Sequence, residues 1–99
     1  MGLIVHDYIS LKIGLSKSEC FFNISSEPII LNKNLNISGF YNISVTFCIF
    51  FDHNAYIQGG TPIDKKKLTV TVSSQEINQN LYNLLYEKLK IDYESYVNM

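Results

Sequence analysis

Two cysteines and two histidines are the side chains of this sequence that could act together as a nucleophile and a general base. They are Cys20, Cys48, His6 and His53. A thiol enzyme needs a thiolate beside an imidazole, but each cysteine lies in a run of alternating apolar residues, where burial raises the pKa of a thiol. Residues 1–15 lack the basic start and the small-residue cleavage site of a secretion signal. We therefore expect two buried, reduced thiols and no catalytic residues.

Carboxylates near His53 could bind a metal ion if the chain folded back on itself. Asp52 and Asp64 are the nearest carboxylates along the chain, and His6 could join them. The spacing does not match a zinc site, because the two distant cysteines have no second pair of ligands beside them. Residues 59–62 are also too short for a phosphate-binding loop. A solvated loop histidine is the better interpretation, and we expect no metal site and no cofactor.

Three consecutive lysines occupy residues 65–67, directly before an alternating apolar run. Neighbouring residues of a strand point to opposite faces, so the triplet places charge on both faces. Two interpretations are open. The lysines protect a sheet edge against pairing with other chains, or they contact a phosphate or an acidic partner. We favour edge protection, because it is a common use of lysine in strands.

The segment 52–62 is a polar interlude between two predicted strands. Gly59, Gly60 and Pro62 mark turns within it, and it is longer than a tight hairpin connection. Long loops on rigid scaffolds often contact partners, so we expect its tip to stand away from the body of the domain. The candidate partner-binding residues of this loop are Asp52, His53, Tyr56, Gln58 and Thr61.

Four tyrosines lie close to the end of the sequence. They are Tyr82, Tyr86, Tyr93 and Tyr96. Tyrosine offers a large contact area at a small entropic cost and is enriched in interfaces. The alternative is that these rings flank the core of the domain. Both interpretations stay open, and the four tyrosines are the candidate partner-binding residues of the helix end and tail.

The hydrophobic period changes once between residues 40 and 90, and this change predicts the framework that holds the candidate side chains. Apolar residues fall on every second position over 41–51 and again over 68–72, which is typical of strands. The spacing becomes helical over 77–89. Ser73, three residues before Glu76, completes the pattern of a capping box at the helix start.

Apolar and polar residues also alternate in parts of the first half of the sequence. Residues 2–15 predict a long first strand, which should bend, bulge or reach a sheet edge at Asp7, the one charge on its apolar parity. Residues 20–24 predict the second strand of a hairpin, and residues 29–31 predict either a short strand or an extended loop. Phe50 lies on the polar parity of its strand, so we expect another element to cover that end.

These elements predict an α+β fold: an antiparallel β-sheet or small β-sandwich of about five strands with one C-terminal helix packed on it. Residues 1–91 would form a single domain, since a chain of this size supports one core. Residues 92–99 show no sustained period. We expect them to be a C-terminal tail, either loose or docked on a neighbour.

Composition narrows the classes of partner. Of the 99 residues, 46% are hydrophobic and 17% charged, which indicates a globular domain. The net charge is −1, and all 8 basic residues are lysines, so the arginine forks that usually recognise phosphates and bases are absent. No apolar run reaches the roughly 20 residues that span a bilayer. We therefore expect neither nucleic acid nor a membrane as a partner.

The run over residues 40–90 resembles small structural proteins of tailed bacteriophages. It reads FYNISVTFCIFFDHNAYIQGGTPIDKKKLTVTVSSQEINQNLYNLLYEKLK, a strand, a Gly/Pro loop, a strand and a Tyr-rich helix. The resemblance covers about half of the chain and leaves out the residues before 40. It implies a non-enzymatic auxiliary capsid, connector or tail protein, an oligomer in a symmetric assembly. Its partners would be other virion proteins or copies of itself, and it would lie in the virion and, during assembly, in the host cytoplasm.

Two other functions stay open. A small viral inhibitor that binds a host or defence protein would use the same loop and tail, as a monomer or dimer. A small hydrolase or nuclease would use His53 and nearby carboxylates. The shortage of converging titratable residues argues against this enzyme.

Overall fold

The computed structural model of the chain describes residues 2–78 and 80–99. They form an α+β fold, a mostly antiparallel sheet with a few short helices, as the periodicity predicts. The molecule is elongated, with principal extents of 41 × 25 × 25 Å. The strands are β1 (Leu3–Val5), β2 (Ile9–Ser10), β3 (Ser16–Lys17), β4 (Cys20–Ile24), β5 (Ile30–Lys33), β6 (Phe40–Phe50), β7 (Asp64–Ser73) and β8 (Tyr96–Asn98). The helices are α1 (His53–Ile57), α2 (Ser74–Ile77) and α3 (Leu81–Lys90).

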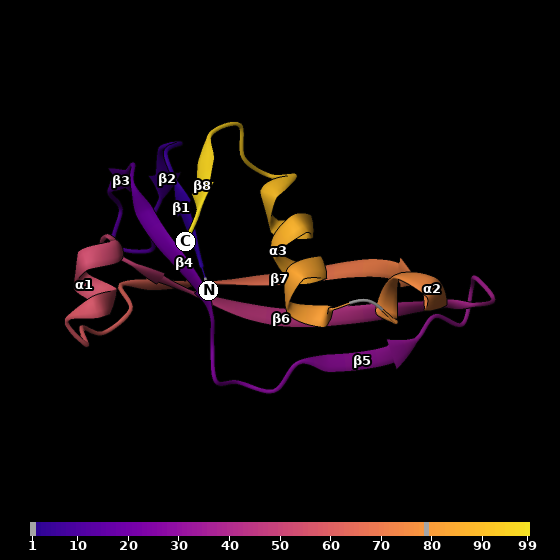
Figure 1. The fold of residues 1–99 in the computed structure, drawn as a ribbon. Coiled ribbons are helices and arrows are strands. Elements are labelled where there is room, and N and C mark those ends of the chain that lie inside the picture. The colour runs from indigo at the N-terminus through magenta and orange to yellow at the C-terminus, as the bar shows by residue number, and fades with distance from the viewer. Residues whose placement is uncertain (1, 79) are drawn as a thin grey trace.

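β6 is the central strand of the main sheet (Figure 1). β7 pairs along one edge of β6 over its whole length, from Phe40 opposite Ser73 to Ile49 opposite Asp64. β4 and β5 share the other edge, with β4 on the C-terminal half of β6 and β5 on the N-terminal half. Pro28 lies between them and cannot donate a ladder hydrogen bond, which accounts for the break predicted there.

β1 and β8 extend the sheet beyond β4. β1 pairs antiparallel with β4 on one side and with β8 on the other, with Ile4 opposite both Phe21 and Val97. Residues 96–98 are therefore a strand of the molecule's own sheet, not the loose or neighbour-docked tail that the lack of period predicts. A strand of three residues is too short to show a period, and its partner lies at the other end of the sequence.

The long first strand predicted over 2–15 is broken near Asp7, as the charge on the apolar parity predicts. The Asp7 carboxylate accepts hydrogen bonds from the backbone N–H groups of Glu94 and Ser95, each at 2.9 Å. Beyond this break, β2 and β3 form a separate two-stranded hairpin. The polar side chain thus ends β1 by binding the chain that leads into β8.

The C-terminal helical region begins as predicted but is not one helix. Ser73 and Glu76 form the capping box at the start of α2, with both reciprocal hydrogen bonds present. The chain then starts again at α3, where the Asn80 side chain accepts a hydrogen bond from the Asn83 N–H (3.2 Å). Gln79, which the predicted helix includes, lies outside the described residues. The asparagines around it favour caps and turns over helix interiors, which explains the restart.

α3 covers one face of the sheet and closes the main core (Figure 1). The buried side chains of this core come from β1, β4, β6, β7 and α3, together with Leu11 from the segment between β2 and β3. They are Leu3, Val5, Leu11, Cys20, Phe22, Ile43, Val45, Phe47, Ile49, Val72, Leu84, Leu85, Tyr86 and Leu89. The α+β class is confirmed. The predicted count of about five strands and the single C-terminal helix are not, because the described residues form a six-stranded sheet and two C-terminal helical segments.

Candidate interaction surfaces

The loop predicted to stand away from the body folds back onto the sheet. Its first half forms α1, whose N-cap Asp52 accepts a hydrogen bond from the Ala55 N–H through Oδ1 (2.7 Å). The Tyr56 ring packs on Phe21 (4.7 Å between centroids) and edge-on against Phe50 (5.1 Å). Phe21 and Phe50 lie on the sheet face opposite α3. This loop is therefore the cover predicted for Phe50. Folding it back removes the Phe21 and Phe50 rings from water, which stabilises the folded-back loop over an extended one.

The five loop residues predicted to bind a partner thus divide into two groups. Asp52 caps α1, and His53 and Tyr56 lie over Phe21, with the His53 ring at 4.8 Å from it. Gln58 and Thr61 are exposed. Tyr56 is still 37% exposed. This part of the loop therefore offers a partner the exposed part of the Tyr56 ring and the side chains of Gln58 and Thr61.

The four tyrosines also divide between the core and the surface. Tyr86 is 5% exposed; its hydroxyl accepts a hydrogen bond from the Ile24 N–H (3.0 Å), and burial raises its pKa. Tyr93 is half-buried, packs on Phe22 at 5.5 Å and receives a hydrogen bond from Lys66 Nζ at 3.2 Å. Tyr82 and Tyr96 remain exposed, by 54% and 38%. Tyr82 lines a shallow groove of about 370 Å³ between α3 and the end of β4.

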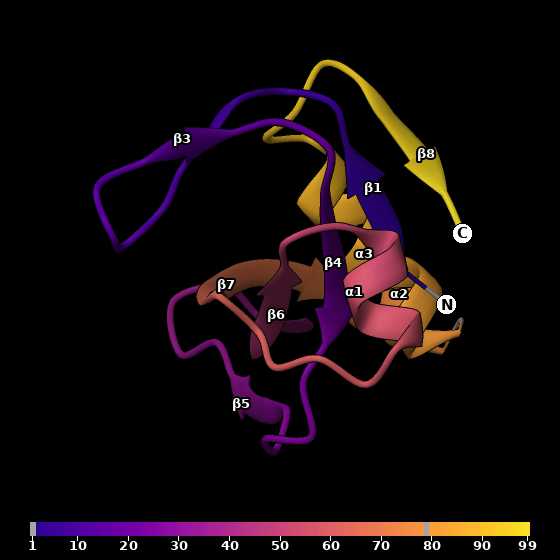
Figure 2. The same ribbon diagram turned by 90° about the vertical axis from the view of Figure 1, so that its left-hand side faces the viewer.

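Several highly exposed apolar side chains lie outside both predicted groups, besides Ile57 in α1 (65%) and Ile91 after α3 (76%). At one end of the molecule the β2–β3 hairpin stands out from the sheet (Figure 2), and its turn is held to the start of β7 by the Lys12 N–H, which donates to Asp64 Oδ2 (2.8 Å). Ile13 and Leu15 in this hairpin are 67% and 64% exposed, and Tyr8 just before it is 79% exposed.

At the other end of the molecule, the turn between β5 and β6 carries Leu35 and Ile37, which are 94% and 47% exposed (Figure 1). Alternation alone counts Ile13 and Leu15 as core residues, because it cannot show that the break at Asp7 turns the hairpin out of the sheet.

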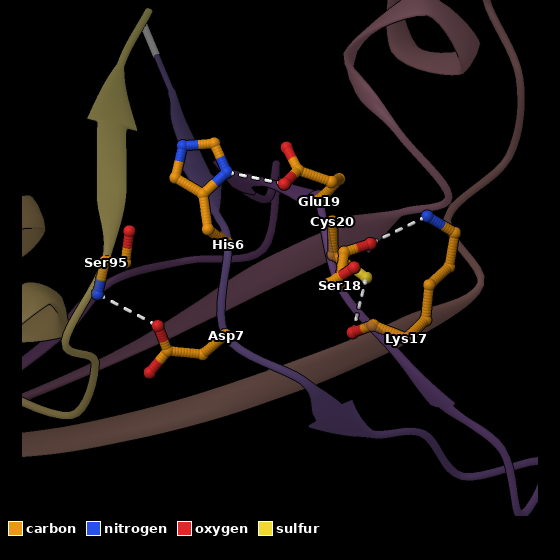
Figure 3. A network of polar contacts seen from close by, with 7 residues as sticks. All are labelled: His6, Asp7, Lys17, Ser18, Glu19, Cys20 and Ser95. Atoms are coloured by element: carbon orange, nitrogen blue, oxygen red, sulfur yellow. Dashed lines mark hydrogen bonds and ion pairs between the residues drawn. The ribbon is translucent and has the colours of Figure 1, made fainter.

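Asp7 anchors the chain that leads into β8 (Figure 3). The two backbone N–H donors lower its pKa below the ordinary value of 3.8. A carboxylate with a lowered folded-state pKa stabilises the fold above its unfolded pKa, and this stabilisation is lost as the pH falls through the folded value. Near this anchor, His6 Nδ1 lies 2.7 Å from Glu19 Oε1 (Figure 3).

Replacing Asp7 with alanine is expected to loosen β8 while the main core stays folded, because only the anchor of residues 94–95 is removed. Hydrogen exchange at the Val97 amide, which pairs with Ile4, should speed up at neutral pH. The unmodified protein should show the same change only below about pH 3.8. Asp92→Ala is the control, since Asp92 pairs with Lys66 instead. Unchanged exchange at Val97 in Asp7→Ala would show that β8 does not depend on this carboxylate.

Of the cysteines and histidines considered for chemistry, Cys20 donates its thiol hydrogen to the Lys17 carbonyl (3.8 Å) and not to the nearby His6 (Figure 3). Both cysteines are free; Cys20 is buried and Cys48 half-buried. Burial raises the pKa of each thiol, the direction opposite to that of a nucleophilic cysteine. The His53 ring packs on Phe21, and His6 contacts Glu19. Within residues 2–78 and 80–99, no group of three His, Cys, Asp or Glu side chains is arranged to hold a metal ion.

The lysine triplet lies on an edge strand, as expected if its charges protect a sheet edge. Among the described residues β7 pairs only with β6. Lys65 forms an ion pair with Glu27 (2.9 Å) and Lys66 with Asp92 (2.8 Å), on opposite faces of the sheet. Lys67 is exposed beside them. Two of the three charges are therefore used within the chain.

None of the helices in the described part of the chain is long and apolar enough to cross a membrane. Comparisons with protein-family models, with curated proteins and with solved structures found no match.

Proposed function

We propose that this chain is a non-enzymatic virion structural or assembly protein that acts through protein–protein contacts in a symmetric assembly. One observation supports it most: large apolar side chains are exposed on projections at opposite ends of an elongated molecule. The resemblance of residues 40–90 to small structural proteins of tailed bacteriophages supports the virion as its location. Its partners are other virion proteins or copies of itself.

The position of the two projections favours assembly over a single contact. Exposed side chains such as Leu35 and Ile13 carry a hydrophobic cost that contact with a partner removes. Because the two apolar projections differ in sequence and lie at opposite ends, each can meet a different surface of a neighbour. Such head-to-tail contacts generate rings when the rotation closes. The sheet and α3 then act as the rigid support of both projections.

The hairpin gives the direct mutational test. Ile13→Ser combined with Leu15→Ser should leave the melting temperature within a few degrees of the unmodified protein, because both side chains are already in water. Incorporation of the double variant into particles, measured by mass spectrometry of purified particles, should fall at least tenfold, since two apolar contacts of roughly 1 kcal/mol or more each are removed. Lys12→Ser, on the same hairpin, is the matched control and should incorporate normally.

Normal incorporation of the double variant would exclude the hairpin as an assembly contact. The alternative of a small viral inhibitor predicts a different result with the same reagents. The unmodified chain would then be absent from particles, and the double variant would still bind a single host or defence protein, because this alternative uses the loop and the tail.

A further inference from the structure

The outer edge of β7 is the longest free edge of the sheet within the described residues. β7 has ten residues, whereas β5 and β8, the other edge strands, have four and three. A free edge exposes unpaired backbone N–H and C=O groups, which can pair with another strand. The β7 edge therefore offers the most backbone groups to a partner.

The register of the β6–β7 ladder shows which groups point outward. The Ser74 N–H donates to the Gly39 carbonyl (3.0 Å), so the even-numbered residues of β7 exchange hydrogen bonds with β6. On the far side of β6, the Phe40 and Thr46 carbonyls accept from the chain of β4 and β5, which fits the same alternation. The odd-numbered residues of β7 therefore direct their backbone groups to the free edge.

Both ends of this edge are closed by side chains of the chain itself. At the start of β7 the Lys65 N–H donates to Asp64 Oδ1 (2.8 Å). At its end the Ser73 N–H donates to Glu76 Oε1 (3.1 Å) as part of the capping box. The open section is left in the middle and consists of the backbone groups of Lys67, Thr69 and Thr71.

We propose that this open section pairs with the same section of a second copy, antiparallel about a two-fold axis at Thr69. The inference deepens the proposed function by specifying one contact of the assembly. In this register Thr69 faces Thr69 of the second copy, and Lys67 faces Thr71 in both directions. All three outward-facing residues of each copy gain hydrogen-bonded partners.

The side chains favour this register over its neighbours. Leu68 and Val70 are half-buried and lie against the core. In this register Leu68 of each copy lies opposite Val70 of the second copy, so the remaining apolar surface of both side chains is covered. The lysines at 65–67 face the uncharged residues 71–73 of the second copy. An axis moved toward the lysines would place like charges opposite each other, which is destabilising, and an axis at Thr71 would require the occupied N–H of Ser73. The lysine triplet therefore selects one register instead of closing the whole edge.

Replacing Thr69 with lysine tests the proposal, because it places two like charges opposite each other at the axis. Ser44→Lys is the matched control. Ser44 lies opposite Thr69 on β6, and the hydroxyl oxygens of the two residues are 3.0 Å apart. Its replacement by lysine therefore removes the same contact and adds the same charge to the same face of the sheet, but away from the free edge. Sedimentation up to about 1 mM protein should show the unmodified chain and Ser44→Lys moving from 11.4 kDa toward twice that mass. Thr69→Lys should raise the dissociation constant about fivefold, the effect of roughly 1 kcal/mol for the one like-charged cross-strand pair at the axis.

A disulfide tests the register independently of charge. In a Cys48→Ser background, Thr69→Cys should form a bridged dimer under mild oxidation, because hydrogen-bonded antiparallel partners have Cα atoms about 5.5 Å apart. Thr71→Cys should not, because the two cysteines would be four positions out of register. A chain that stays monomeric at all concentrations would overturn the proposal. Dimers that form equally in Thr69→Lys, or bridge equally at 71, would overturn the β7 contact while leaving the proposed function standing; only absence from particles would remove that function.

Discussion

Leu85→Asp is expected to abolish cooperative folding of the domain. Leu85 is fully buried in α3 and belongs to the main core. The substitution removes a buried leucine, which costs about 2–5 kcal/mol, and places a carboxylate where the core side chains around it are apolar, which costs several more. Small domains are stable by only about 5–15 kcal/mol, so little or no folded protein should remain.

Asn83→Asp is the matched control for this prediction, because it introduces the same charge on the exposed face of the same helix. Thermal melts followed by far-ultraviolet circular dichroism should show a normal transition for Asn83→Asp and none for Leu85→Asp. Similar melting temperatures for the two variants would mean that α3 does not bury the leucine stripe on the sheet.

Phe21→Ala is expected to remove about 3–5 kcal/mol of stability and to release α1 from the sheet. Phe21 is 1% exposed and contacts the rings of Phe50, His53 and Tyr56, so its loss empties the small core on the sheet face opposite α3. Urea denaturation should give the loss of stability. Hydrogen exchange at the Ala55 amide, which Asp52 caps, should report the release of α1.

The neighbouring ring Phe51 supplies the control for Phe21. Phe51 is 54% exposed and lies beneath Lys17 Nζ at 4.1 Å, so Phe51→Ala should change stability by less than about 1 kcal/mol. If Phe21→Ala and Phe51→Ala destabilise the domain equally, or Ala55 stays protected in Phe21→Ala, α1 is not held by this ring cluster.

The parts of the fold that the sequence predicts correctly are those in which period and local capping act together. β6 and β7 are long enough to show strict alternation, and the capping box of Ser73 and Glu76 is complete within four residues. Asp7 marks the break in the first strand, because a charge on an apolar parity needs partners. Each of these signals lies within a short stretch of sequence.

The features that sequence reasoning misses depend on contacts between distant residues. β8 forms because β1, at the other end of the chain, offers a free edge. α1 folds back because Phe21, on a different strand, shares a sheet face with Phe50. No local pattern contains either partner, and the alternation of residues 96–98 is too short to count.

The same limit applies to the candidate surface residues. Composition identifies tyrosines but does not separate Tyr86, which lies on the buried side of α3, from the exposed Tyr82. Helical spacing does not make this distinction, because each tyrosine adjoins one leucine of the apolar stripe and lies three residues before another. Tyr86 is set apart by a distant contact, the hydrogen bond that its hydroxyl accepts from the Ile24 N–H of β4. The exposed Ile13 and Leu15 could not have been found from the sequence either, since their exposure follows from the turn of the β2–β3 hairpin out of the sheet.

The central claim is that this chain is a structural part of a symmetric particle. The most direct test is to measure its mass in solution and its copy number in virus particles purified from the source of the sequence, by native mass spectrometry and quantitative peptide analysis. The proposal predicts a fixed copy number per particle that is a multiple of the particle's symmetry order. A stable free monomer that is absent from the particles would contradict it.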